Sequence, residues 1–191
     1  MKKATASRSE FVDYYHLERY LFETVSPRYH KAKSLNAFDF FCIVVWKANR
    51  AKSKIAARLL SYGHATLDLA VKALTSQLIA AKTPEAKLHV LFESWGFRLP
   101  MATAVLTVLY PEDFTVYDVR VCDSLSAFHS LNNCTNSERR WNGYQSYKLA
   151  VEAAAPAGLS LRDKDRWLWG KSFATQLQLN VTDAFKRGGG S

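Results

Sequence analysis

Residues 83–111 read TPEAKLHVLFESWGFRLPMATAVLTVLYP and predict two helices joined by a very short turn. The first three residues are typical of a helix start with proline in the first turn, and apolar residues then recur at helical spacing until Gly96. The helical pattern resumes at Leu99 and continues to the end of the stretch. Because only residues 96–98 separate the two patterns, we expect a helical hairpin.

Helical spacing continues on both sides of this hairpin. Further helices are predicted at about residues 9–25, 36–50, 52–62, 66–81, 119–128, 138–154 and 161–179. The first is expected to stop at Ser26-Pro27, and the one at 66–81 is long enough to be broken in two. The run Phe38–Trp46 is apolar all round, which predicts the central buried helix. Phe114–Tyr117 is expected to be extended, and with no strand ladder or repeat the fold class is all-α.

Length and composition limit the possible classes of protein. The chain has 191 residues, and 48% hydrophobic content with 8 Gly and 5 Pro excludes disorder and low complexity. We expect one domain over residues 1–187, built as one body or two small lobes, followed by a flexible Gly/Ser tail at 188–191. No apolar run is long enough to cross a bilayer and the start lacks a signal-peptide core, so we expect no membrane partner and a cytoplasmic location.

Cysteine and histidine spacing gives no sign of a metal centre or a cofactor. The three cysteines, Cys42, Cys122 and Cys134, form no CxxC pair and are expected to be free thiols. The five histidines show no metal-ligand spacing; they are His16, His30, His64, His89 and His129. We therefore expect no metal and no cofactor.

The positive charge is uneven along the chain. The net charge is +9, and residues 1–60 alone carry 12 Lys+Arg against 5 Asp+Glu. Within residues 47–58 five basic residues stand without an acid, directly after Trp46. Such a run is suited to the phosphate backbone of nucleic acid. An acidic protein partner or a merely solvated helix face are the alternatives.

Two motifs together resemble the helix-hairpin-helix DNA glycosylase superfamily. The first is Gly96–Ala102 with the helix that it opens, and the second is Val116-Tyr117-Asp118-Val119-Arg120-Val121. That family has a Gly-apolar-Gly hairpin, an apolar helix and a hydrophobic stretch that ends in Val-Asp-x-His. The resemblance is clearest over Glu85–Leu125 and weaker over Phe38–Leu60.

The resemblance implies a fold and a function. The expected fold has two small helical lobes around a cleft. The expected activity is that of a monomeric DNA glycosylase, which flips a damaged or modified base out of double-stranded DNA and hydrolyses its N-glycosidic bond. An alkylated purine, a damaged pyrimidine or a bulky modified cytosine are all compatible substrates, in base excision repair or in defence against phages with modified genomes.

Asp118 is the expected catalytic residue. It stands where a helix N-cap is predicted, and backbone N–H groups and the helix dipole would hold its carboxylate ionised and fixed in place. Cleavage of an N-glycosidic bond builds positive charge on the sugar, which such a carboxylate stabilises while it orients or deprotonates a water. The alternative is an ordinary N-cap, worth about 1 kcal/mol of helix stability.

Three positions depart from the family pattern. Arg98 replaces the second hairpin glycine, so either the turn avoids positive φ there or the turn differs, and the arginine could contact phosphate. Pro100 stands where lyase-type members carry their Schiff-base lysine, which implies a monofunctional enzyme that uses water. Lys47 or Lys52 are the alternative lysines for that role. Arg120 replaces the histidine that often follows the aspartate.

The remaining site residues follow from the resemblance together with the charge and aromatic patterns. Asn49 is expected to fill the gap left by the flipped base, although asparagine also caps helices. The candidate base pocket consists of Trp46, Tyr117, Tyr15, Trp167 and Trp169, with burial in the core as the alternative for each. Tyr14 and Tyr15 are adjacent, so at most one of them is core. The expected DNA contacts are Lys47, Asn49, Arg50, Lys52, Lys54, Gly96, Phe97 and Arg98.

Two other functions stay open at this point. A non-catalytic hairpin module that binds DNA structure or a modified base would also explain the hairpin, and Arg98 and Pro100 favour it. A protein that binds an acidic protein partner would show no salt-dependent affinity for DNA.

Overall fold

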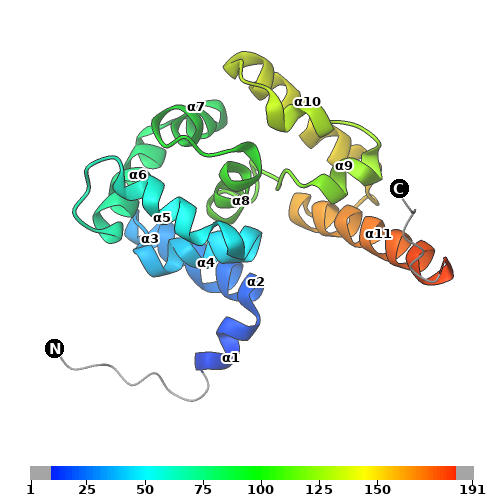
Figure 1. The fold of residues 1–191 in the computed structure, drawn as a ribbon, viewed down its shortest axis with the longest axis horizontal. Helices are drawn as coiled ribbons and strands as arrows, with labels where there is room; N and C mark the ends of the chain where they lie inside the picture. Colours follow the sequence, from blue (N-terminus) through cyan, green and yellow to red (C-terminus); the bar gives the residue numbers. More distant parts are fainter. Residues whose placement is uncertain (1–9, 184–191) are drawn as a thin grey trace, which may run out of the picture. The chain divides into compact units, whose positions relative to one another are not determined.

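The computed structural model describes residues 10–183 and divides the chain into two compact units, Met1–Phe114 and Thr115–Ser191 (Figure 1). Every regular element among the described residues is a helix, as the sequence predicted for an all-α fold. The predicted helix start at Ser9 and the Gly/Ser tail at 188–191 lie outside the described residues.

The first unit begins with a helical segment that is longer and more broken than predicted. It comprises α1 (Glu10–Tyr15), α2 (Leu17–Tyr20), a π-helix (Leu21–Val25) and α3 (Ser26–Ala32). The expected stop at Ser26-Pro27 is wrong, because the proline lies in the first turn of α3, a position in which proline is tolerated.

A buried carboxylate ties these helices to the next one. Asp39 is 1% exposed and lies in α4 (Ala37–Ala48), whose N-cap Asn36 accepts its backbone N–H at 2.7 Å. The Tyr20 hydroxyl donates to its Oδ1 at 2.8 Å, and the Arg28 guanidinium pairs with its Oδ2 at 2.6 Å. The charge is thus paired and hydrogen-bonded, which its burial requires.

The next helices match the sequence patterns closely. A 3₁₀ turn (Asn49–Ala51) joins α4 to α5 (Lys52–Leu60), and Gly63 follows with a φ of +83°. The helix α6 (Leu67–Ala80) is unbroken, and the Thr66 hydroxyl accepts the Leu69 N–H at 3.2 Å. The hairpin follows as α7 (Pro84–His89), a π-helix (Val90–Ser94) and α8 (Leu99–Leu109), which packs against both.

The helix at the centre of the first unit is α8. All of its residues except Pro100 are buried, and it packs along α4 (Figure 1). The expectation that Phe38–Trp46 forms the central buried helix is wrong, because α4 buries one face and leaves Phe38 58% exposed. Within α8 the Thr103 hydroxyl donates to the Leu99 carbonyl at 2.8 Å, which satisfies this polar group in the core.

The second unit opens with the extended segment 115–118. It continues with α9 (Val119–Leu125), a 3₁₀ helix (His129–Asn133), α10 (Ser137–Ala154) and α11 (Leu161–Thr182). The helix α9 ends before the predicted Phe128, because Ser126 adopts the left-handed conformation with φ +53°. It packs on α11, where the Ser124 hydroxyl donates to the Leu168 carbonyl at 2.8 Å.

Among the helices within residues 10–183, none has both the length and the apolar character needed to span a bilayer.

Candidate functional site

The hairpin turn is held by its own backbone. Gly96 has a φ of +60°, in the left-handed region that favours glycine, and its N–H donates to the Phe92 carbonyl at 3.0 Å. The Phe97 N–H donates to the Leu91 carbonyl at 2.8 Å. Phe97, an expected DNA contact, is only 4% exposed and packs near Phe40, so its side chain belongs to the core.

The backbone of Arg98 shows that the turn avoids positive φ at the second hairpin position. Its φ is −81°, so an L-residue is accommodated without strain, and it serves as the N-cap of α8. The side chain is exposed. The departure from glycine therefore leaves the short turn intact and adds a positive charge at its tip.

The basic segment, residues 47–58, lies beside this turn at its Arg58 end. Arg58 reaches the hairpin: its Nη1 is 3.2 Å from the point where a Cβ on Gly96 would lie, and the Tyr62 hydroxyl is 3.5 Å from it. Lys54 lies four residues before Arg58 in α5, which places the two on the same side of this helix. Arg50 lies in the 3₁₀ turn just before α5, and both Arg50 and Lys54 are exposed. We call Arg50, Lys54, Arg58 and Arg98 the α5–hairpin face.

Within residues 10–183 no ion pair neutralises the charges of the α5–hairpin face. Lys52 is exposed as well, and its Nζ donates a hydrogen bond to Asn49 Oδ1 at 3.1 Å. Asn49, the predicted gap-filling residue, is therefore exposed, but its side-chain oxygen already accepts a hydrogen bond. Trp46 and Lys47 are half-buried, and the Trp46 ring packs edge-on against Phe22.

Asp118 occupies the predicted N-cap of α9. Its backbone is extended, with φ −138° and ψ 140°, and its Oδ1 accepts the Arg120 N–H at 2.9 Å. The residue is half-buried, whereas the three residues before it are buried. A carboxylate is therefore presented at the point where a buried segment reaches the surface of its unit.

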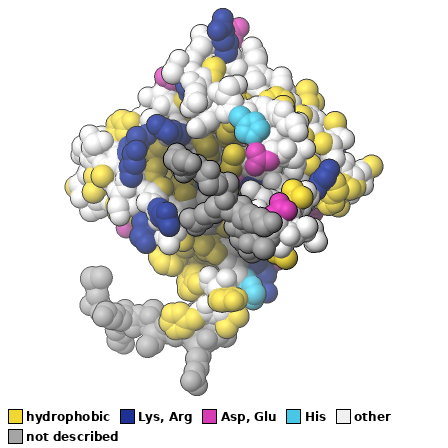
Figure 2. All heavy atoms as spheres, turned by 45° about the vertical axis from the view of Figure 1, so that its right-hand side comes forward, with side chains coloured by type: hydrophobic (Ala, Val, Ile, Leu, Met, Phe, Trp, Pro, Cys, Tyr) yellow, Lys and Arg dark blue, Asp and Glu magenta, His cyan; other side chains and the backbone are white. Residues whose placement is uncertain are grey.

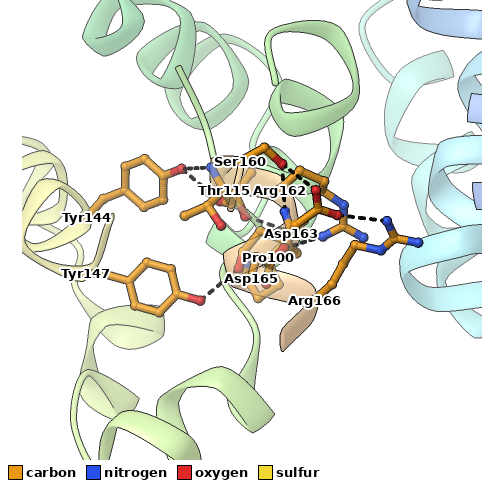
Figure 3. A network of polar contacts seen from close by, with 11 residues as sticks. Pro100, Thr115, Tyr144, Tyr147, Ser160, Arg162, Asp163, Asp165 and Arg166 are labelled. Carbon is orange, nitrogen blue, oxygen red and sulfur yellow. Dashed lines mark hydrogen bonds and ion pairs between the residues drawn. The ribbon is translucent and has the colours of Figure 1, made fainter. Parts of the chain in front are cut away.

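Two tyrosines from α10 fix the segment that leads to Asp118, and Figure 3 shows both pointing their hydroxyls toward it. The Tyr144 hydroxyl accepts the Thr115 N–H at 2.9 Å and donates to the Thr115 carbonyl at 2.8 Å. The Tyr147 hydroxyl donates to the Val116 carbonyl at 2.8 Å. We call Tyr144 and Tyr147 the tyrosine clamp.

The clamp lies wholly inside the second unit. Both rings are fully buried, and burial raises the pKa of Tyr147 well above its ordinary value, while a backbone hydrogen bond with Asp118 offsets part of that rise. Sequence reasoning missed both residues. Their spacing of three on an otherwise polar helix was the available signal for a buried pair.

Tyr117, an expected base-pocket residue, is buried instead. It is 4% exposed, and its hydroxyl donates to the Phe128 carbonyl at 2.8 Å. Burial raises the pKa of this phenol, so it stays protonated. The side chain anchors the chain beside Asp118, in agreement with the alternative that it belongs to the core.

Arg120 is held by the last helix. Its guanidinium lies 5.3 Å from the centroid of the Trp169 ring and 5.6 Å from that of Phe173, and its Nη1 donates to Gln176 Oε1 at 3.0 Å. Trp169 is 41% exposed and Trp167 39% exposed, so neither is a core residue. Arg120, two residues after Asp118, thus lies against a partly exposed aromatic surface of α11.

Tyr15 is far from buried. It is 86% exposed on α1, whose apolar side chains also face the solvent at the bottom of Figure 2. Tyr14 is 39% exposed and packs against Tyr20 and Phe38, so neither of the adjacent tyrosines is core.

The expected site residues divide between the units. The hairpin, the basic segment, Trp46 and Tyr15 belong to the first, and Asp118, Tyr117 and the two α11 tryptophans to the second. Among residues 10–183 no three His, Cys, Asp or Glu side chains are grouped as a metal ion requires. Comparisons with protein-family models, with curated proteins and with solved structures gave no match for this chain.

Proposed function

We propose that the protein is a monofunctional DNA glycosylase. In this proposal the α5–hairpin face binds the backbone of double-stranded DNA, and Asp118 acts on the sugar of a flipped base. The observation that carries the proposal is the setting of Asp118: a half-buried carboxylate that follows a backbone segment held in place by two buried tyrosine hydroxyls.

This setting suits the charge that glycoside cleavage creates. As the bond between C1′ and the base nitrogen breaks, the base leaves with the electron pair and the sugar becomes positive. A carboxylate that is already fixed in position stabilises that charge without reorganising. It also takes a proton from the attacking water, whose oxygen forms the new bond to C1′ and leaves an abasic site.

The α5–hairpin face supports DNA as the partner. Three of its members, Arg50, Lys54 and Arg58, carry no internal ion pair in the described residues, and Arg98 is exposed at the turn beside Arg58. Guanidinium groups bind phosphate oxygens through paired N–H donors. The backbone of DNA presents such groups at regular spacing.

The decisive experiment uses Asp118→Asn. Asparagine caps helices about as well as aspartate, so the variant should fold while losing the negative charge. Duplexes that carry an alkylated purine, a damaged pyrimidine or a modified cytosine, together with modified phage DNA, are incubated with each protein and treated with alkali. We expect breaks at the modified base with wild type and at least a hundredfold fewer with the variant.

Asp163→Asn is the matched control, because Asp163 is an exposed acid in the first turn of α11 in the same unit. It should cleave like wild type. Equal cleavage by Asp118→Asn would remove Asp118 from the mechanism. With Pro100 in place of a lysine we also expect no borohydride-trapped adduct, and trapping of one would contradict the monofunctional assignment.

A non-catalytic DNA-binding module is the second candidate. The observation that favours it is the hydrogen bond from the Arg120 N–H to Asp118 Oδ1, which is an ordinary capping contact. No cleavage of any substrate, with salt-dependent duplex binding retained, would establish this alternative.

A further inference from the structure

A small open cavity in the first unit is lined by lysine, histidine and tyrosine side chains together with the apolar Ile79 and Ala81. Its volume is about 200 Å³, and it lies where the end of α3, the start of α7 and the residue after α8 meet. The polar side chains around it are Lys33, Lys82, Lys87, His30, Tyr29 and Tyr110. None of them belongs to the α5–hairpin face or to the setting of Asp118.

Lys87 is the most enclosed of these cations. It is only 9% exposed, its Nζ donates to the Ala81 carbonyl at 2.7 Å, and the same atom lies 4.8 Å from the centroid of the Tyr110 ring. Burial lowers the pKa of Lys87, and the nearby Asp113 offsets this in part. An enclosed ammonium is costly unless an anion accompanies it.

The two tyrosines supply a further donor. The Tyr29 and Tyr110 hydroxyl oxygens are 2.5 Å apart, with Tyr29 1% exposed. Two hydroxyls that share one hydrogen bond use one proton between them, so the second proton remains to be donated elsewhere. Because both residues line the cavity, an acceptor inside it is in the position to receive that proton.

Lys33 occupies a backbone position that favours glycine. It caps α3 with a φ of +53°, and its N–H donates to the Tyr29 carbonyl at 2.7 Å. Glycine would take this conformation at lower cost. A lysine here keeps its charge at the cavity at the expense of stability, a pattern found at binding sites.

The volume of the cavity and the charges around it indicate what kind of ligand it could hold. Pockets for drug-sized ligands measure about 300–1,000 Å³, so a cavity of about 200 Å³ suits a smaller group. Three ammonium groups, an imidazole and a free hydroxyl proton match a doubly charged anion with several acceptor oxygens. We propose that this cavity binds a phosphate group, either as inorganic phosphate or as the terminal monoester of a nucleotide or a DNA end.

Calorimetric titration with inorganic phosphate, against sodium chloride of equal ionic strength, tests the proposal. Wild type and the exposed control Lys72→Met should bind phosphate saturably, and Lys87→Met should bind at least tenfold more weakly. Lys33→Gly should unfold at a higher temperature than wild type and yet bind phosphate more weakly. Should Lys87→Met fail to fold by circular dichroism, the exposed Lys82→Gln replaces it and should also weaken binding.

Absence of saturable phosphate binding by wild type would overturn the proposal, and so would unchanged affinity in the folded cavity variants. Three further arms identify the source of the group: a nucleoside 5′-monophosphate, a duplex with a 5′-phosphate and the same duplex with a 5′-hydroxyl. Only the difference between the two duplexes counts, because the α5–hairpin face would bind both equally. The arm with the tightest phosphate-dependent binding names the source.

Discussion

At the scale of single residues, Thr115 stands out as a buried hydroxyl with no hydrogen-bond partner among the described residues. The tyrosine clamp binds its backbone and leaves Oγ1 unsatisfied. Valine has nearly the same shape and no polar atom, so Thr115→Val should stabilise the protein by about 1 kcal/mol in urea unfolding.

Thr103→Val is the matched control for this substitution. The Thr103 hydroxyl is also buried but donates to the Leu99 carbonyl, so its removal should bring no gain. If Thr115→Val instead destabilised the protein by 1 kcal/mol or more, the hydroxyl of Thr115 would have to have a partner such as an ordered water.

At the scale of elements, the tyrosine clamp joins α10 to the segment before Asp118. Tyr144→Phe removes one hydroxyl but leaves both the N–H and the carbonyl of Thr115 buried without a partner. We expect a loss of about 2–4 kcal/mol in the free energy of unfolding, together with faster hydrogen exchange at the Thr115 amide.

The exposed Tyr15→Phe is the control, because its hydroxyl lies on an 86% exposed side chain and should contribute nothing measurable. A Tyr144→Phe variant with wild-type stability and unchanged exchange at Thr115 would mean that the clamp does not hold this segment.

The helices show which parts of a fold can be predicted from sequence. Caps and short turns depend on local chemistry, so the N-caps Thr66, Thr83 and Asp118 and the hairpin turn were all predicted at the right residues. Pro27 was misjudged because a proline that ends one helical segment can equally begin the next.

Burial was harder to predict, because it depends on residues that are distant in sequence. The apolar run in α4 and the one in α8 look alike in composition, and only packing leaves Phe38 exposed while α8 is enclosed. The same holds for the site: Asp118 followed from its local cap, whereas the Tyr144 and Tyr147 clamp and the approach of Arg58 to Gly96 come from tertiary structure.

At the scale of the whole molecule, the net charge of +9 and its concentration in the first 60 residues predict how the proposed DNA binding would depend on salt. Each phosphate neutralised by the protein adds about 0.9 to the slope of log K against log salt. Replacing Arg50 and Lys54 by glutamine should therefore lower that slope by roughly 2 between about 50 and 200 mM salt, if each contacts one phosphate.

The control is a second double variant that loses the same two positive charges at positions outside the α5–hairpin face. Lys72 and Arg139 are exposed on α6 and α10, and replacing both by glutamine also removes two positive charges. If binding depended on total charge alone, both double variants would lose the same slope, and the α5–hairpin face would not be the interface. A loss confined to the Arg50/Lys54 variant assigns the contact to that face, because counterions are released only where phosphates are touched.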